Sequence, residues 1–233
     1  MKNCYKLAIT AAIVGFGLGT LNVAQAATVS LTSSNQGWWS TDRSNQNQNE
    51  NYITGNLGIE GFRSFFTFDL GTLARVSTAT LQVQRYEGSV NPTTTLGFFD
   101  VETSADVLSQ KVNNPDINIY NDLGSGKNYG TFNVTNTFGN SDEILNFVLN
   151  SDAIADINAR SGKFFSIGGA LLGVLETEDQ VQVLFGASGD SSAILVVDAD
   201  LVPVPEPATL SGITLAGITG WWLKRKRKAF QAL

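Results

Sequence analysis

Apolar and polar residues alternate with a period of two along much of the chain, and this alternation limits the fold more than any other feature. In the segment 62–70 the even-numbered residues are mostly Phe or Leu, whereas most odd-numbered residues are polar. The segment 79–84 repeats the pattern, with Ala79, Leu81 and Val83 as its apolar positions. This spacing is typical of β-strands that are buried on one face.

Further short strands are predicted between closely spaced turn formers such as Gly71, Asn91-Pro92, Gly124-Ser125-Gly126 and Gly168-Gly169. Besides a strand through Trp38, they are expected at 28–31, 94–101, 117–120, 130–135, 144–149, 163–168, 180–185 and 193–197. Many short strands with frequent turns favour an all-β protein. We therefore expect one antiparallel β-sandwich of jelly-roll type over residues 27–202.

One short helix is expected inside this domain. Ser151 is placed to cap it, Ile154 and Ile157 share a face, and Gly162 follows at a position that suits a left-handed helix end. A weaker pattern at 104–110, with Ser104 as the capping residue, leaves a second helix open.

The first 26 residues have the form of a secretory signal peptide. Lys2 and Lys6 precede an apolar stretch, which would form the signal helix, and Ala24 and Ala26 provide the small residues that a signal peptidase recognises. Cys4, the only cysteine, lies in this segment. The mature domain is therefore expected to begin near Ala27 and to be stabilised by its core without disulfides.

The last 31 residues, 203–233, form a three-part tail. Pro205, Glu206 and Pro207 are followed by an apolar segment at 208–223 and then by the cations Lys224, Arg225, Lys226, Arg227 and Lys228. A helix over 208–223 would rise about 24 Å, short of a bilayer core of about 30 Å but workable with local thinning. The cations would hold the end of the chain in the cytoplasm.

This tail resembles the PEP-CTERM sorting signal of Gram-negative bacteria. The match includes Pro205, Glu206, Pro207, the Trp221-Trp222 pair and the basic cluster. The resemblance implies an exosortase-type processing enzyme as a partner, besides signal peptidase and the secretion machinery. It also implies transient anchoring in the inner membrane, followed by transfer to the cell surface or the extracellular matrix. A simple single-pass anchor that is never cut remains the alternative.

Charge divides the chain in the same way. Of the fifteen Lys and Arg residues, seven lie in the two terminal segments, which leaves eight cations against twenty-one carboxylates between residues 27 and 207. The exported part therefore carries a net charge of about −13 at neutral pH. Such a surface repels nucleic acid, so no nucleic-acid partner is expected.

The absence of histidine from the sequence excludes Ser-His-Asp and Cys-His catalysis and imidazole metal sites. Glycoside hydrolysis by paired carboxylates stays open as an alternative function, with Asp69, Asp100, Glu102 and Asp122 near strand ends. Carboxylates are common in so acidic a domain, and we do not expect an enzyme. No cofactor is expected either, although Asp198 and Asp200 are weak candidates for calcium ligands.

Aromatic side chains indicate carbohydrate binding, because sugar rings stack on flat Trp and Tyr faces. Six aromatic residues have many Asn and Gln residues nearby: Trp38, Trp39, Tyr52, Tyr86, Tyr120 and Tyr129. In a strand Trp38 and Trp39 would point to opposite faces, so one is expected in the core. Trp39 and Tyr86 are the predicted exposed residues.

The segments Arg63–Leu70 and Ser77–Leu81 resemble the opening of secreted β-sandwich modules known as DNRLRE or disaggregatase-related domains. That resemblance implies a fold and no activity. The two terminal signals and the fold together predict an exported structural or carbohydrate-binding component of the exopolysaccharide or biofilm matrix. The Asn/Gln-rich segment 44–51 is expected to be a solvated loop, or a lid over a site.

Overall fold

The structure is a computed structural model that describes residues 26–44, 50–85, 87–137, 143–174, 181–186 and 191–200. The predicted signal peptide up to Gln25 and the predicted sorting tail lie outside these residues. Within them, no helix has the length and apolar character needed to cross a membrane. The described strands and helices belong to one compact unit, which extends over Gln25–Val202.

The smaller of two antiparallel sheets contains four strands in the order β1-β11-β5-β8. Their bounds are β1 (Ala26–Thr32), β11 (Ile194–Asp200), β5 (Val76–Arg85) and β8 (Glu143–Val148). All four overlap predicted strands, at 28–31, 193–197, 79–84 and 144–149. Buried and more exposed positions alternate along most of β5 and along β11 because one face of the sheet packs on the core and the other meets solvent.

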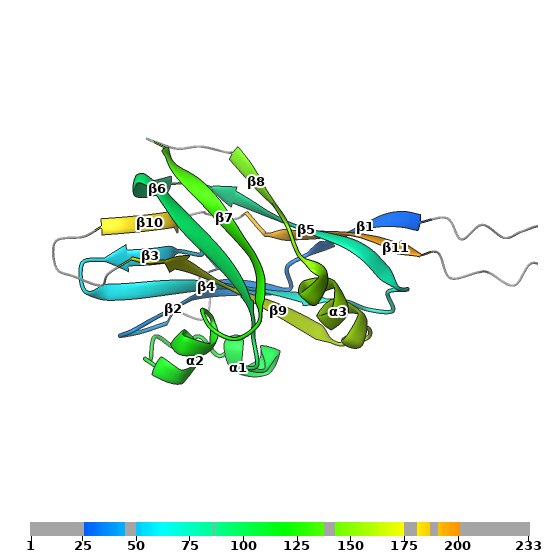
Figure 1. Ribbon diagram of the computed structural model, residues 1–233. Coiled ribbons are helices and arrows are strands. Elements are labelled where there is room, and N and C mark those ends of the chain that lie inside the picture. The colour runs from blue at the N-terminus through cyan, green and yellow to red at the C-terminus, as the bar shows by residue number, and fades with distance from the viewer. Residues whose placement is uncertain are drawn as a thin grey trace, which may run out of the picture. The chain divides into compact units, whose positions relative to one another are not determined.

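The larger sheet contains seven strands (Figure 1). They are β2 (Asn35–Ser40), β3 (Thr54–Leu57), β4 (Glu60–Asp69), β6 (Glu87–Asp100), β7 (Asn128–Thr137), β9 (Phe164–Leu172) and β10 (Val181–Gly186). β2 pairs with one edge of β4, and β7 with one edge of β6. Between β4 and β6, one half of the sheet holds β9 alone, and the other half holds β3 and β10 side by side.

The main core lies between the two sheets and contains residues from both. Its aromatic members include Tyr52, Phe66, Phe98, Phe147 and Phe185. Phe98 and Phe147 meet edge to face at 5.0 Å between ring centroids, and Tyr52 meets Phe66 in the same way at 5.1 Å. Such pairs add about 0.5–1.5 kcal/mol each beyond their burial. The prediction of an all-β antiparallel protein is confirmed.

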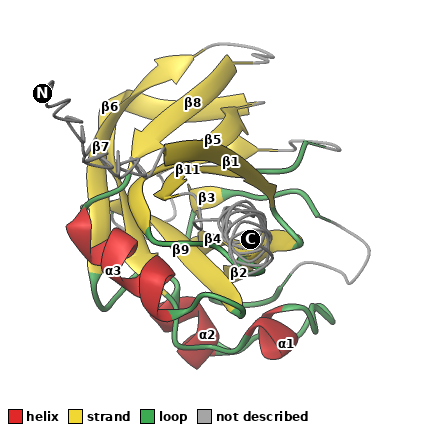
Figure 2. Ribbon diagram, turned by 90° about the vertical axis from the view of Figure 1, so that its right-hand side faces the viewer, coloured by secondary structure: helices red, strands yellow, loops and turns green. Residues whose placement is uncertain are grey.

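A second, smaller apolar cluster lies on the opposite face of the larger sheet. It is covered by α1 (Ala105–Leu108) and α2 (Ile117–Asp122), and its members are Trp39, Phe65, Val101, Leu108, Ile119 and Leu123 (Figure 2). The prediction that segment 62–70 is buried on one face is therefore wrong, because Phe65 is fully buried. β4 has cover on both of its faces.

The helix content also differs from the prediction of one short helix. α3 (Ser151–Ala159) is the predicted helix, but its capping side chain is Asn150, which accepts hydrogen bonds from the N–H groups of Asp152 and Ala153. Gly162 has the predicted left-handed conformation, with φ of 78°. α1 lies in the segment 104–110 that the sequence left open as a second helix, and Ser104 is its N-cap residue, although its side chain makes no capping hydrogen bond. α2 is additional. Residues 117–120 were predicted as a strand, yet the carboxylate of Asp116 caps them into a helix.

Two predicted turns lie inside strands. Asn91-Pro92 falls within β6, where the pairing with β7 shifts register between Gly88 and Thr93. Gly168 and Gly169 lie in the middle of β9. A Cβ on Gly168 would lie 2.4 Å from the carbonyl oxygen of Leu123, so glycine is needed there because the end of α2 approaches the strand closely.

Candidate functional site

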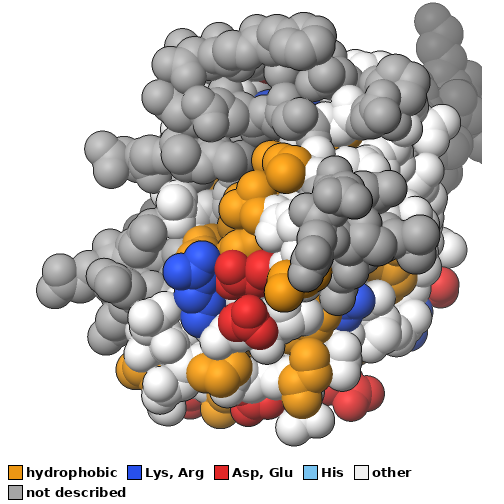
Figure 3. Space-filling model, turned by 90° about the vertical axis from the view of Figure 1, so that its left-hand side faces the viewer, with side chains coloured by type: hydrophobic (Ala, Val, Ile, Leu, Met, Phe, Trp, Pro, Cys, Tyr) orange, Lys and Arg blue, Asp and Glu red, His pale blue; other side chains and the backbone are white. Residues whose placement is uncertain are grey.

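The two ends of the described domain differ in what they carry. Ala26 pairs with Asp200, so the domain's first and last strand residues lie together at one end, here called the basal end. The opposite, distal end is formed by the end of β2, by β3 and by the start of β4 (Figure 1). Figure 3 looks onto this distal end and shows basic and acidic side chains in contact, beside a row of hydrophobic ones.

Trp38 is the aromatic centre of the distal end. It comes from β2, where it pairs with Ser64 of β4, and its ring meets Phe62 edge to face at 5.1 Å. Its indole N–H donates to Oδ1 of Asn51 at 3.3 Å. The guanidinium of Arg43 lies 5.9 Å from the ring centroid, within range of a cation–π contact. The side chain is half-buried, so part of the indole remains open to solvent.

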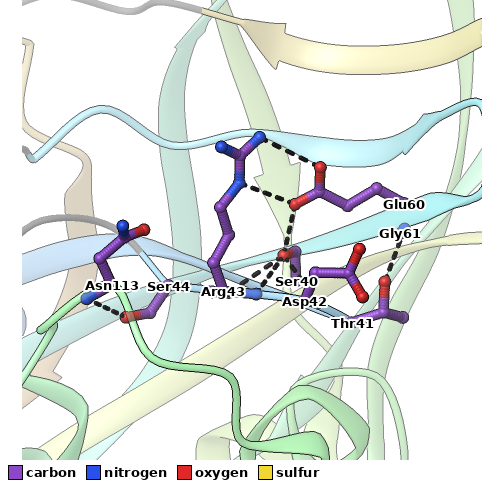
Figure 4. Close-up of polar contacts among 8 residues, drawn as sticks. All are labelled: Ser40, Thr41, Asp42, Arg43, Ser44, Glu60, Gly61 and Asn113. Atoms are coloured by element: carbon purple, nitrogen blue, oxygen red, sulfur yellow. Dashed lines mark hydrogen bonds and ion pairs between the residues drawn. The ribbon is translucent and has the colours of Figure 1, made fainter.

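Arg43 and Glu60 form a bidentate ion pair beside this indole (Figure 4). Nε and Nη2 of Arg43 lie 2.9 and 3.1 Å from the two carboxylate oxygens. The buried hydroxyl of Ser40 lies 2.7 Å from Oε1 of Glu60, to which it donates, and it accepts from the main-chain N–H of Arg43. These contacts hold the tight turn after β2 against the start of β4. Trp38, Ser40, Arg43, Asn51 and Glu60 are together called the Trp38 site.

The chemistry of the Trp38 site suits an uncharged ligand rich in hydroxyl groups. The charges of Arg43 and Glu60 cancel, while 51% of the Arg43 side chain stays exposed with donors at its edge. Carboxylate oxygens can accept hydrogen bonds from hydroxyls, and the indole offers a flat apolar surface. Among the described residues no group of three or more acidic side chains is placed to hold a metal ion.

The prediction that Trp39 is the exposed tryptophan is wrong. Trp38 and Trp39 do point to opposite faces, as predicted, but Trp39 is only 4% exposed and belongs to the small cluster under the helices. Trp39 is therefore not an exposed candidate for sugar contact. Tyr86, the other choice, lies outside the described residues.

The remaining aromatic candidates are core residues. Tyr52 and Tyr129 are fully buried and Tyr120 is 5% exposed. Of the described candidates, Trp38 alone keeps an appreciable exposed surface. The contact between Arg43 and Glu60 could not be predicted from the sequence, because 17 residues separate them. Only a polar turn directly after the Trp38-Trp39 pair hinted at a site there.

The calcium candidates lie at the basal end of β11. Oδ1 of Asp198 accepts from the hydroxyl of Thr28 and Oδ2 from that of Thr78, both at 2.7 Å. These two hydrogen bonds lower the pKa of Asp198. Both carboxylate oxygens of Asp198 thus accept hydrogen bonds from side chains of the neighbouring strands β1 and β5. These bonds link the three strands to one another. Asp200 lies two residues further on the same strand.

The carboxylates considered for glycoside hydrolysis mostly fix main-chain turns. Asp122 accepts from the N–H groups of Glu102 and Thr103, and Asp69 accepts from Gly71. Asp100 accepts from the N–H of Lys127, in the turn after α2. Each of these three carboxylates is engaged in a different turn.

A second polar cluster joins α3 to β7 near the basal end. Nζ of Lys127 lies 2.7 Å from both carboxylate oxygens of Asp156, and the hydroxyl of buried Tyr129 donates to Oδ2 at 2.7 Å. Burial raises the pKa of Tyr129 far above its usual range, and the bond to Asp156 adds to this. Burial opposes ionisation of Asp156, yet its bonds from Lys127 and Tyr129 outweigh burial and lower its pKa. The bond to Asp156 raises the pKa of Lys127.

Comparison with known proteins does not identify a family. A scan against protein-family models finds no match, and no curated protein matches the chain significantly. The residues themselves therefore carry the functional argument.

Proposed function

We propose that this is an exported protein that is sorted to the cell surface or exopolysaccharide matrix and binds a neutral glycan there through the Trp38 site. The observation that carries the binding proposal is the pairing of the half-exposed Trp38 indole with the Arg43–Glu60 ion pair at the distal end. An aromatic face beside fixed hydrogen-bonding groups is the usual design of a sugar site. The acidic charge of the domain favours a neutral polymer over an acidic one.

Export and sorting rest on the two terminal segments of the sequence. The signal-like segment before Ala27 and the PEP-CTERM-like tail from Val204 support delivery through the secretion machinery and an exosortase-type enzyme. The basal position of Ala26 and Asp200 agrees with this proposal. Asp200, where the described domain ends, thus lies at the opposite end from the Trp38 site.

The strand order supports a jelly-roll type of sandwich. With β2, β3 and β10 set aside as additions, the sheets contain β1-β11-β5-β8 and β4-β9-β6-β7. In eight strands numbered along the chain, this is the order 1-8-3-6 and 2-7-4-5 of two interlocked Greek keys. Folds of this type occur widely in lectin domains, but the glycan proposal depends on the site and not on the fold.

Affinity electrophoresis of residues 27–205 in gels containing the host's exopolysaccharide tests the binding proposal. We expect retardation that Trp38→Ala abolishes, and the same retardation with calcium or with chelator. Phe164→Ala is the matched control, because Phe164 is 48% exposed but lies at the start of β9, next to Asp69 and away from Trp38. Unchanged migration of the wild-type domain in every gel would overturn carbohydrate binding.

Mass spectrometry of the mature C-terminus tests sorting separately. We expect the chain from envelope or matrix fractions to end near Pro205–Pro207. A mature species that retains Trp221 and Trp222 would instead support the permanently anchored form.

A further inference from the structure

One side of the sandwich is open along two facing edge strands. Among the described strands β7 pairs only with β6, and β8 pairs only with β5. Between them lies a groove of about 220 Å³. Its apolar lining comes from Phe132 and Val134 of β7 and from Leu145 and Phe147 of β8.

The groove is closed at both ends by hydrogen bonds to main-chain carbonyls of β7. At one end the N–H of Asn150 donates to the carbonyl of Tyr129 at 2.9 Å. At the other, Nη1 of Arg85 donates to the carbonyl of Thr135 at 2.9 Å, and Arg85 pairs with Glu143. The main-chain carbonyls of Tyr129 and Thr135 therefore point toward the groove.

Main-chain groups of alternate residues point to the same edge of a strand. The pairing of β7 with β6 is regular from Thr131 to Thr135, so Thr131 and Asn133 present their N–H and C=O groups to the same edge as Thr135, toward the groove. On β8, the N–H of Leu149 donates to Ala79 of β5, so the main chains of Asn146 and Val148 face the other way. Both walls offer unpaired strand edges to an extended segment.

Arg85 gives a second, independent indication of a missing partner. Its side chain is 96% buried, since only 4% is exposed, and it lines the groove. Its Nε–H has no acceptor among the described residues. A buried donor without an acceptor costs about 1–3 kcal/mol. A carbonyl from a segment in the groove would supply the acceptor.

The segment Leu201–Pro205, Leu-Val-Pro-Val-Pro, has the required chemistry. A residue before proline is restricted to extended conformations, which favours a strand at Val202 and Val204. Pro203 and Pro205 have no N–H, so one edge of this strand lacks hydrogen-bond donors. The other edge, which carries the N–H and C=O groups of Val202 and Val204, can form a complete set of hydrogen bonds with a neighbouring strand. Both valine side chains then point to one face, where they would meet the apolar lining.

The segment cannot reach the groove of its own domain. Three strand spacings, from β11 through β5 and β8 into the groove, amount to about 14 Å. Asp200 and the groove are also offset along the strand direction. Val196 of β11 and Val148 of β8 lie level with each other, because both pair with Thr80 of β5. Asp200 lies four residues beyond Val196, which adds about 13 Å along the strands. The separation is therefore about 19 Å, whereas the four residues from Asp200 to Val204 span at most about 14 Å.

We propose that the β7–β8 groove binds the Leu201–Pro205 segment of a second copy of this chain as an added strand. The donor segment and the groove are different surfaces, so the contact is head-to-tail and builds chains or rings of copies. Because each domain carries a large negative charge, screening by salt strengthens the association. This inference does not depend on carbohydrate binding at the Trp38 site.

Sedimentation of residues 27–207 at rising concentration tests the proposal; all described core residues lie within this range. We expect the apparent mass to rise at least about twofold, more so at higher salt, and Val202→Asp with Val204→Asp to abolish the rise. These substitutions lie outside the described domain, so they leave its core intact. Leu201→Asp is the matched control, because Leu201 points to the opposite face, and it should associate as the wild type does.

A peptide with the sequence of residues 200–206, added to the domain ended at Asp200, provides a second readout. Amide NMR shifts are expected along β7 and β8, and Asn133→Pro, which removes one N–H from the free edge of β7, should weaken them. A domain that stays monomeric at all concentrations would overturn the proposal. Association that persists in the double valine variant, or peptide shifts elsewhere on the domain, would overturn it equally.

Discussion

The Lys127–Tyr129–Asp156 cluster and the Ser40–Arg43–Glu60 cluster each join a cation, a carboxylate and a hydroxyl, but their surroundings differ. In the first, the hydroxyl belongs to the fully buried core residue Tyr129, so the carboxylate of Asp156 provides the acceptor that this buried donor needs. In the second, the hydroxyl belongs to Ser40 and the ion pair lies beside the half-exposed indole of Trp38. The two ion pairs are similarly exposed, at 51% and 17% for Arg43 and Glu60 and at 44% and 19% for Lys127 and Asp156. The same chemistry therefore lies against the main core in one place and beside an open aromatic surface in the other, and that surface distinguishes the Trp38 site.

The largest expected effect is that of Asp156→Ala. This change leaves the buried Tyr129 hydroxyl without its acceptor and Lys127 without its partner, and should lower the free energy of unfolding by roughly 2–3 kcal/mol. Urea denaturation measures it. Asp156→Asn, which keeps an oxygen acceptor, should cost clearly less. Equal losses in both variants would mean that the charge, and not the buried hydroxyl, decides the stability of this cluster.

Acid should weaken the Asp156 cluster. Because the pKa of Asp156 is lower in the folded protein than in the unfolded chain, its contribution is present above the unfolded value near pH 4 and is lost as the pH falls through the lower folded value. Urea midpoints measured from about pH 6 to about pH 2 should fall less in Asp156→Asn than in the wild type. Parallel pH profiles would contradict this assignment.

Tyr129→Phe isolates the hydroxyl. The ring remains packed against Phe165, whose centroid lies 5.7 Å away, while the bond to Asp156 is lost. We expect a loss of about 1 kcal/mol in the free energy of unfolding. A double-mutant cycle with Asp156→Ala should show a coupling well above zero. Strict additivity would separate the tyrosine from the cluster.

Glu60→Gln should have the smallest effect on stability, below about 1 kcal/mol, because glutamine keeps an oxygen that can accept from Ser40 and an ion pair with a half-exposed arginine contributes little. Retardation in polysaccharide gels should nevertheless fall, since the glutamine holds Arg43 less firmly beside Trp38. Arg43→Gln should behave similarly in both measurements. A loss of stability as large as that of Asp156→Ala would erase the difference between the two clusters and make the Trp38 site structural.

Part of the candidate site was open to prediction. The Trp38-Trp39 pair marked the right strand, and the rule that neighbours in a strand face opposite sides was correct for both residues. Which tryptophan is buried depended on α1 and α2, which lie more than 60 residues further along the chain. The ion pair between Arg43 and Glu60 likewise depended on the pairing of β2 with β4.

By itself, the sequence determined the elements whose signals are local. The alternation at 79–84 gave β5, and the residues around Ser151 and Gly162 gave α3, because side-chain period and helix ends are decided within a few residues. The tertiary structure decided what depends on distant contacts: cover on both faces of β4, a glycine-containing strand at β9, and the open edges of β7 and β8. Burial is a property of the neighbours that a residue acquires, and in an antiparallel sandwich most of those neighbours are far away in sequence.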